Sequence, residues 1–355
     1  MSADVPVARK DGEMTNFLRS KIAAILVLLV LPNVTSSQET KTPRELSLIE
    51  GAKKEGKLVY WGAGNAKEVE SFLAKFRQRY PFIKTEWWRA AAGALHQKTL
   101  SEARAGAHNV DVSVTDMEYL QELKKTGLMK RYEWHNTKGW SPAHKDPDGY
   151  WVYRNIIPTM IGYNTTLVSA ADAPKTWEHV LDPKWKGAIS MTKDGGEWSL
   201  QLWAAWGKEK MISYLKRLSR NNLVLGEGGT ARIEMLAAGA SKIDMELNLN
   251  RIMDYQEKGA PLEWVRTNPV LAIGNPFFIA EHAPHPNAAM LFADWFTSLE
   301  GGQAYYDVSG KLLPHPGIKG RISEALKGLN VVYTPAEIAV HGNEANKIFK
   351  DIFWK

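Results

Sequence analysis

The chain has 355 residues, of which 44% are hydrophobic, 24% charged and 10% aromatic. This composition predicts a globular protein with two domains and excludes a disordered or fibrous chain. The absence of cysteine excludes disulfides, zinc fingers, cysteine-ligated clusters and a cysteine nucleophile. The net charge of +6 comes from lysines and arginines scattered among acids, with no basic stripe, so we expect no nucleic-acid partner.

The first recognisable pattern lies near the N-terminus. Ten uninterrupted apolar residues, 22–31, follow Arg19 and Lys21, and small and polar residues come after them. A membrane-spanning helix needs about 20 apolar residues. The pattern therefore predicts a secretory signal peptide and leader in residues 1–37, and hence a periplasmic protein. An uncleaved membrane anchor is the alternative.

Residues 57–125 alternate between strand and helix patterns. Short apolar runs predict strands, and apolar residues at helical spacing predict helices between them. The expected strands are 57–61, 83–88 and 110–114, and the expected helices are 69–76, 94–105 and one around Leu120 and Leu123. Repetition of strand, loop and helix predicts a parallel sheet with helices on its faces.

Residues 131–155, rich in Trp, His, Gly and Pro, interrupt this pattern, and a strand at 156–163 leads into a second α/β series. Its expected strands are 187–191, 223–225, 242–247, 262–265 and 270–273, and its expected helices are 198–218, 231–238 and 286–298. Pro286 suits the first turn of the last helix, where proline is tolerated. A polar C-terminus of helical character follows.

Several motifs in this order resemble one family. The two most specific are TWEHVLDPKWKG at residues 176–187 and APHPNAA at residues 283–289. Shorter matches are RAAAG at 89–93, NVDV at 109–112 and GAPLEWV at 259–265. Together they resemble an extracellular solute-binding protein of the family-1 and ferric-iron type, which is the capture component of an ABC importer. The resemblance covers nearly all of residues 44–320.

The resemblance implies a two-lobed α/β fold of the type II periplasmic binding proteins, with parallel-sheet lobes joined by hinge strands. Lobe 1 would comprise residues 38–157 and 270–355, and lobe 2 residues 158–269. The lobes would close on a ligand by hinge motion. The protein would be a monomer without catalytic activity, cofactor or metal, and its partners would be a small-molecule ligand and an ABC permease in the inner membrane.

Loops at the carboxyl ends of parallel strands are where ligands bind in such sheets. The candidate ligand-binding residues lie in these loops and on one face of the 242–247 strand. They are Trp61, Gly62, Ala92, Gly93, Thr115, Asp116, Gly195, Gly196, Glu197, Trp198, Gly228, Gly229, Glu246 and Asn248. Trp61 is favoured over Tyr60 as the side chain that faces the cleft. Asp116 serves equally well as a helix N-cap.

The loop before the helix at 198–218 is the most informative one. Small residues there leave backbone N–H groups open, and the resemblance implies an anionic group bound at this helix start. Trp198 either stacks on an organic ligand or packs with Trp203 and Trp206. These features predict a small, anionic organic ligand. A dinucleotide is not expected, because Lys67 occupies the third glycine position after Gly62 and Gly64.

Two alternatives remain open. The first is a ferric-iron or other metal-ion binder. Against it, Met245-Glu246-Leu247 stands where the ferric binders of the family have a tyrosine pair, and Fe(III) prefers phenolate and carboxylate oxygens. His282 and His285 have metal-like spacing, but neighbouring prolines break the helix that would present both. The second is a secreted enzyme, although the sequence has no G-x-S-x-G, H-E-x-x-H or P-loop motif.

Overall fold

A computed structural model describes residues 41–354, so the expected signal peptide lies outside the described residues. Residues from Thr42 onward form one compact unit. None of the helices in this described part has the length and apolar character needed to cross a membrane.

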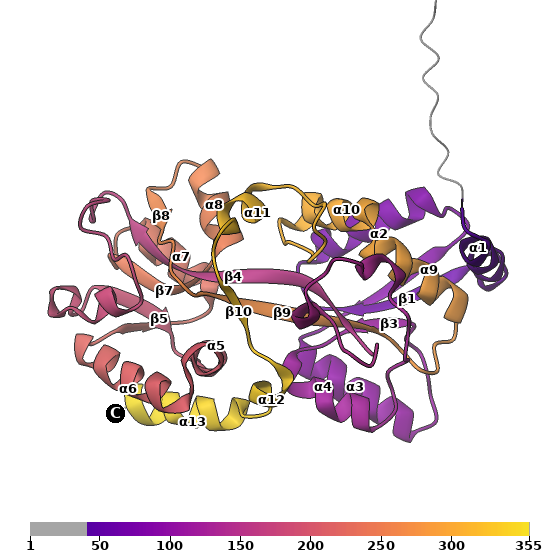
Figure 1. Cartoon of the computed structure of the whole chain (residues 1–355), viewed down its shortest axis with the longest axis horizontal. Helices are drawn as coiled ribbons and strands as arrows, with labels where there is room; N and C mark the ends of the chain where they lie inside the picture. Colours follow the sequence, from indigo (N-terminus) through magenta and orange to yellow (C-terminus); the bar gives the residue numbers. More distant parts are fainter. Residues whose placement is uncertain (1–40, 355) are drawn as a thin grey trace, which may run out of the picture. The chain divides into compact units, whose positions relative to one another are not determined.

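A mixed sheet forms the centre of the described unit (Figure 1). Its main path runs β2-β1-β3-β9-β4-β7-β5-β6, and β10 and β8 pair with β9 and β4 respectively. The strands are β1 (Lys57–Gly62), β2 (Lys84–Arg89), β3 (Val112–Val114), β4 (Val152–Asn164), β5 (Ile189–Thr192), β6 (Val224–Gly226), β7 (Ile243–Asn248), β8 (Leu262–Trp264), β9 (Val270–Ile279) and β10 (Val331–Tyr333).

Helices cover both faces of this sheet. They are α1 (Pro43–Glu55), α2 (Ala66–Arg79), α3 (Ala92–Arg104), α4 (Met117–Lys125), α5 (Gly196–Trp206), α6 (Lys208–Leu218), α7 (Gly229–Ala237), α8 (Leu249–Glu257), α9 (Pro286–Thr297), α10 (Leu299–Ser309), α11 (Arg321–Leu326), α12 (Ala336–Ala339) and α13 (Gly342–Phe353).

The strand directions divide the sheet into two parallel blocks. The first block, β2-β1-β3, and the second block, β7-β5-β6, are each parallel within themselves. The long strands β4 and β9 lie between the blocks and pair antiparallel with each other and with the adjoining strands. The expected fold class, two α/β lobes joined by hinge strands, is confirmed.

Apolar periodicity explains how the helices of the first block dock. In α2 the spacing of Val69, Phe72, Leu73 and Phe76 puts all four on one buried face. The Phe72 ring stacks on Trp295 of α9, with ring centroids 5.2 Å apart. The Asn65 side chain caps the start of α2, and the helix ends before Pro81, as the sequence predicts.

Three predicted elements have different bounds in the structure. The helix expected at 198–218 is two helices, α5 and α6, because Gly207 adopts a positive φ of 85° and ends α5. The strands expected at 156–163 and 270–273 are longer, since β4 begins at Val152 and β9 continues to Ile279. The helix α8 was not predicted.

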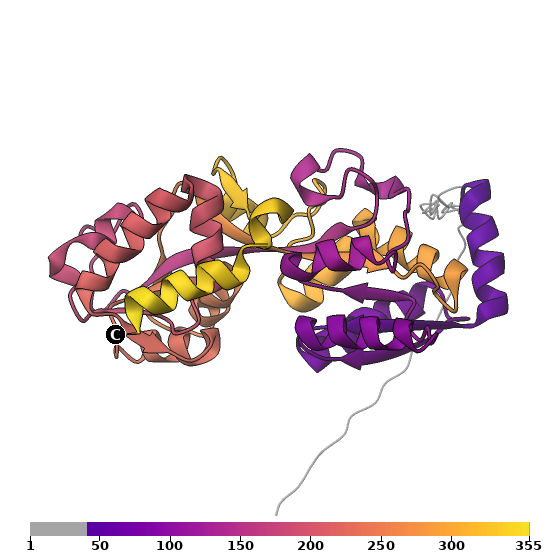
Figure 2. The ribbon, with the colours of Figure 1, turned by 90° about the horizontal axis from the view of Figure 1, so that it is seen from below.

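The C-terminal strap, which we define as residues 319–353, runs from α11 through β10 and α12 to α13. α12 contacts α4 of the first block and α5 of the second, and α13 packs along α5 and α6 (Figure 2). The Phe349 side chain is fully buried in this contact, and Lys208 Nζ donates to Glu344 at 2.6 Å. This packing differs from the expected inclusion of all of 270–355 in lobe 1. The exact lobe boundaries remain a prediction.

Candidate functional site

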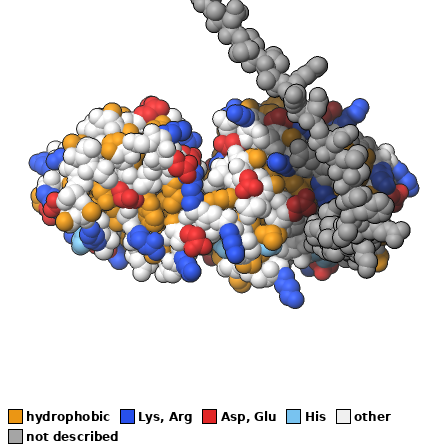
Figure 3. Space-filling view, turned by 90° about the horizontal axis from the view of Figure 1, so that it is seen from above, with side chains coloured by type: hydrophobic (Ala, Val, Ile, Leu, Met, Phe, Trp, Pro, Cys, Tyr) orange, Lys and Arg blue, Asp and Glu red, His pale blue; other side chains and the backbone are white. Residues whose placement is uncertain are grey.

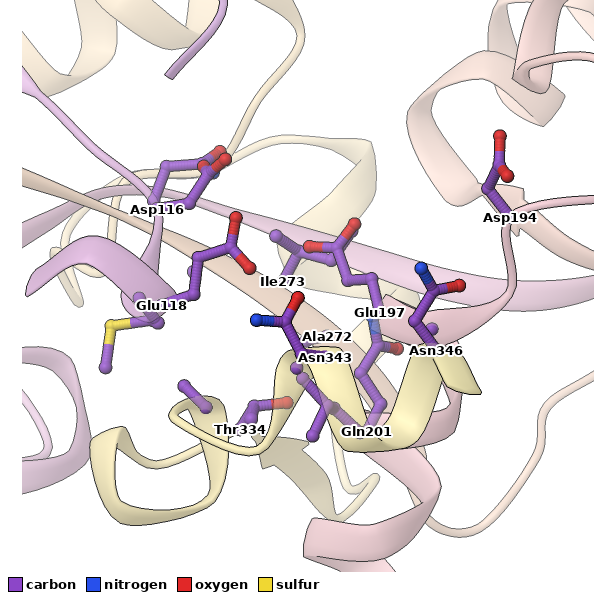
Figure 4. Close-up of a pocket in the computed structure, with 17 residues that line it drawn as sticks. Asp116, Glu118, Asp194, Glu197, Gln201, Ala272, Ile273, Thr334, Asn343 and Asn346 are labelled. Carbon is purple, nitrogen blue, oxygen red and sulfur yellow. The ribbon is translucent and has the colours of Figure 1, made fainter. Parts of the chain in front are cut away.

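A cavity of about 300 Å³ lies between the first turns of α4 and α5, the middle of β9 and the C-terminal strap (Figure 4). The residues that line it are Asp116, Met117, Glu118, Asp194, Gly196, Glu197, Leu200, Gln201, Ala272, Ile273, Gly274, Asn275, Thr334, Ala339, Gly342, Asn343 and Asn346. Both blocks and the strap therefore contribute to one site.

The charge of this cavity is entirely negative. Asp116 and Glu118 come from the start of α4, and Asp194 and Glu197 come from the start of α5. Its lining contains no lysine, arginine or histidine. On the outer surface, by contrast, basic and acidic side chains are interspersed (Figure 3). We call this site the acidic cavity.

Two of the acidic side chains, Asp116 and Glu197, have a raised pKa. Burial raises the pKa of Asp116, and the neighbouring Glu118 adds to the effect. The Glu197 side chain is open to solvent within the cavity, yet desolvation by the surrounding walls, followed by Asp116 and Glu118, raises its pKa to about 7. A positively charged group would relieve this repulsion.

Side-chain amides complete the wall. Gln201, on the same face of α5 as Glu197, is 1% exposed, and neither its amide oxygen nor its amide nitrogen has a partner among the described residues. The buried Asn346 Oδ1 of α13 lacks one as well. Asn275 Nδ2 of β9 donates to Asp116 Oδ1 at 3.2 Å. Unpartnered buried polar atoms are unfavourable unless a ligand or water pairs with them, so the wall is suited to a polar solute.

A second polar cluster lies at β7, where Glu246 is close enough for the charge of Glu197 to act on it. Arg232 of α7 donates to Asp244 Oδ1 at 2.7 Å, and both side chains are buried. Glu246 adjoins them, with Oε2 3.8 Å from Arg232 Nη2. Desolvation raises the pKa of Glu246 to about 8, and the charges of Asp244 and Glu197 add to the rise.

Three of the sequence-predicted residues line the acidic cavity: Asp116, Gly196 and Glu197. Asp116 occupies the N-cap position of α4 without making a side-chain cap hydrogen bond, which leaves its carboxylate available to the cavity. Glu246 belongs to the β7 cluster and does not line the cavity, and Asn248 ends β7 at the N-cap of α8.

Two tryptophans predicted to contact ligand are core residues instead. Trp61 is 3% exposed and meets Trp88 edge to face, with ring centroids 5.5 Å apart. Its neighbour Tyr60 points to the opposite side of the strand, toward Arg154, and is buried as well, so the expected exposure of Trp61 in the cleft was wrong. Trp198 is fully buried and lies against Trp177 and Tyr214. The packing interpretation of Trp198 is therefore correct, although its neighbours differ from those expected.

The remaining predicted positions do not line the acidic cavity. Ala92 and Thr115 are buried, and Gly62 leaves room for the Tyr60 ring. Gly93 adjoins the Tyr119 hydroxyl, while Gly228 and Gly229 start α7 in open space. A Cβ on Gly195 would lie 2.2 Å from the Phe349 ring, so this glycine permits the close approach of α13.

Sequence reasoning missed most of the polar lining. Glu118 and Gln201 had a detectable signal, because each lies on a helix within one turn of a predicted site residue. Asn343 and Asn346 share a helix face, but nothing local indicates that this face meets α5. Arg154, discussed below, had a signal in being the one charged residue of its strand.

The histidines with metal-like spacing have other partners. His285 Nδ1 lies 2.9 Å from Asp111 Oδ2, and the His282 ring packs on His108. Within residues 41–354, no group of three or more histidine, cysteine, aspartate or glutamate side chains is arranged to hold a metal ion.

Known proteins share this architecture. A family model described as bacterial extracellular solute-binding protein matches residues 71–318. Iron uptake protein A1 from Synechocystis is 25% identical over 169 residues, and this match spans 46% of each chain, so it covers about half the length of that relative.

Among solved structures, iron-bound HitA from Pseudomonas aeruginosa superposes with a TM-score of 0.70 at 17% identity, over 83% of this chain and 99% of HitA. AfuA from Actinobacillus pleuropneumoniae, solved with fructose-6-phosphate, superposes with a TM-score of 0.66 at 20% identity, over 83% of this chain and 97% of AfuA. Identities this low establish a common fold and no more.

Two α/β blocks joined by crossing strands, with a polar cavity between them, define a two-lobed binding protein. Because the family model covers well over half of the sequence, the chain belongs to the bacterial extracellular solute-binding proteins. The match ends at residue 318, so the C-terminal strap lies beyond it.

Proposed function

We propose that this protein captures a small solute bearing a positively charged group in the acidic cavity and delivers it to an ABC permease of the inner membrane. It acts as a periplasmic monomer and catalyses no reaction. Family membership supports the capture role. The observation that carries the ligand class is the cavity lining, with four carboxylates and no cationic side chain.

Charge complementarity is the physical reason for this choice. Asp194 and Glu197 flank the start of α5, so an anion at this helix start would face two carboxylates at close range. The anionic group expected there from the sequence is thus disfavoured at this position. A cationic group would instead be attracted by all four carboxylates and would find amide oxygens at Gln201 and Asn346.

Ferric iron is the second candidate, because HitA was solved with iron and the Synechocystis relative is an iron uptake protein. The cavity lining contains carboxylates but no tyrosine, whereas Fe(III) prefers phenolate as well as carboxylate oxygen. This donor set favours an organic cation over iron.

A thermal-shift screen of the protein recovered from the periplasm tests the proposal. The probes are butylamine, putrescine, choline, ferric citrate and glucose 6-phosphate. A ligand at 100 times its Kd adds about 2.7 kcal/mol to the free energy of unfolding, which gives a clear rise in Tm. We expect an organic cation to produce this rise, and Glu197→Gln to weaken its binding by roughly 10- to 100-fold.

The matched control is Glu209→Gln, which makes the same change at an exposed position of α6 outside the cavity. It should bind the cation as the wild type does. A rise in Tm with glucose 6-phosphate alone would refute the cationic ligand class. A rise with ferric citrate alone that Glu197→Gln abolishes would establish the metal-binding alternative.

A further inference from the structure

Arg154 of β4 is a buried arginine that forms no ion pair within the described residues. It is 7% exposed. Its Nη1 lies 3.3 Å from the Tyr60 hydroxyl and 3.4 Å from the Ala63 carbonyl oxygen, both long for hydrogen bonds, and its Nε has no partner among the described residues. A buried charge without a counter-charge is strongly unfavourable, so binding of an anion would stabilise this guanidinium.

A β-bulge determines where this side chain lies. In the pairing of β4 with β9, Tyr153 lies opposite Pro276 and Asn155 lies opposite Asn275, so Arg154 is the extra residue. A bulge of this kind re-aims a side chain, and bulges are common next to binding sites. The bulge also places Arg154 beside the strand position that faces Asn275, which lines the acidic cavity.

The charges around the guanidinium leave it without a counter-ion. Arg154 borders a hollow of about 10 Å³, which has room for one water-sized group such as a single oxygen of an oxyanion, together with Tyr60, Tyr305, Lys311 and Glu68. Lys311 Nζ is already paired with Glu68 Oε2 at 2.7 Å, which leaves Arg154 as the uncompensated charge of this hollow. Asp116, on the wall of the acidic cavity, is near enough for its charge to act on Arg154 without contacting it.

We propose that Arg154 binds an oxyanion group, a carboxylate or a phosphoryl group, of the same solute whose cationic group occupies the acidic cavity. The ligand is then a small zwitterion. This inference rests on the proposed function for the cationic half of the ligand, whereas Arg154 itself provides the anionic half.

Three probes with the same four-carbon skeleton measure the contributions of the cationic and the anionic group of the ligand separately. They are 4-aminobutanoate, butylamine and butanoate. Calorimetric titration of the wild type should show 4-aminobutanoate binding at least tenfold more tightly than butylamine. In Arg154→Met this ratio should fall to about one while the affinity for butylamine is kept. In Glu197→Gln both amine-bearing probes should weaken. The size of the effect is that expected for hydrogen bonds to a charged group, roughly 10- to 100-fold.

The Tm of the empty protein distinguishes a binding role from a structural one. Replacement of a buried unpaired charge by an apolar side chain of similar volume leaves stability unchanged or raises it, so Arg154→Met should melt at or above the wild-type temperature. If Arg154 has only a structural role, Arg154→Met should lower the Tm and leave the affinity ratio intact, and this result would overturn the inference. Arg154→Lys, which keeps the charge but loses the planar fork, should retain part of the preference.

The two proposals can fail separately. If butylamine binds as tightly as 4-aminobutanoate, the Arg154 inference is wrong, whereas the proposal that the acidic cavity binds a cationic group stands. If neither amine binds, the cationic ligand class is wrong, and inorganic phosphate then tests Arg154 alone. Binding of phosphate that Arg154→Met abolishes would support the oxyanion site, and phosphate binding that the substitution leaves unchanged would refute it.

Discussion

The carboxylate of Glu197 couples the cavity to pH. Its pKa of about 7 lies above the ordinary value for glutamate, with desolvation as the first cause and the charges of Asp116 and Glu118 after it. Between the ordinary value and pH 7 the folded protein therefore binds more protons than the unfolded chain. The stability of the empty protein consequently falls as pH rises through this window. A bound cation favours the ionised carboxylate, so the effect on affinity has the opposite sign.

We expect an organic cation to bind several-fold more tightly at pH 8 than at pH 5.5, because Glu197 is ionised only at the higher pH. Titration of the wild type with butylamine at both pH values measures this difference. In Glu197→Gln the pH dependence should be smaller, while Glu209→Gln should retain it. Equal affinity of the wild type at both pH values would show that Glu197 does not contact the cation.

The assignment of Trp198 to the core has its own test. Trp198→Ala should lower the free energy of unfolding by about 3–5 kcal/mol, as is usual for a large buried aromatic side chain. The Kd of the folded variant should stay within a few-fold of the wild-type value. Trp203→Ala, which removes a partly exposed ring stacked on His341, is the matched control and should destabilise less. Complete loss of binding by folded Trp198→Ala would restore the ligand-stacking hypothesis.

At the scale of elements, the C-terminal strap forms one wall of the site. Phe349 packs α13 against the start of α5 at Gly195, and α12 contacts α4. At the first residue of α13, a Cβ on Gly342 would lie 3.1 Å from Glu118 Oε2 of α4. The strap therefore presents Asn343 and Asn346 to the cavity (Figure 4).

Phe349→Ala should detach α13 and lower the free energy of unfolding by up to about 3–5 kcal/mol. Hydrogen exchange of residues 336–353 should become faster than in the wild type, since local opening follows the loss of buried contacts. Affinity for the solute should fall as well, because two amides leave the wall. Phe353→Ala, at the less buried end of α13, is the control. Unchanged exchange in Phe349→Ala would mean that other contacts hold the strap.

Local periodicity explains which elements the sequence predicted correctly. The parallel strands and the amphipathic α2 and α9 follow from apolar spacing and proline positions, which act over a few residues. The break at Gly207 depends on one backbone conformation, and the length of β4 depends on pairing with β9 over residues far along the chain. The cavity is harder still to predict, since its acids and amides come from segments near residues 116, 197, 275 and 343.

At the scale of the whole described unit, β4 and β9 connect the two blocks and the acidic cavity lies between them. A solute that contacts Asp116 on one side and Glu197 on the other favours the closed arrangement. Small-angle X-ray scattering should therefore show a smaller radius of gyration with saturating ligand than without it. Glu197→Gln at the same ligand concentration should show less contraction, and an unchanged radius in the liganded wild type would argue against hinge closure.

The strap also determines to which block the C-terminal end of the folded chain is attached. The helix α1 packs on α9 beside the first block, whereas α13 packs on α5 and α6 of the second (Figure 1). The beginning and the end of the folded chain are thus attached to different blocks. Any movement of one block relative to the other changes the distance between the two ends of the chain. A fluorophore at each end would then convert solute capture into an energy-transfer signal, with no label placed near the cavity.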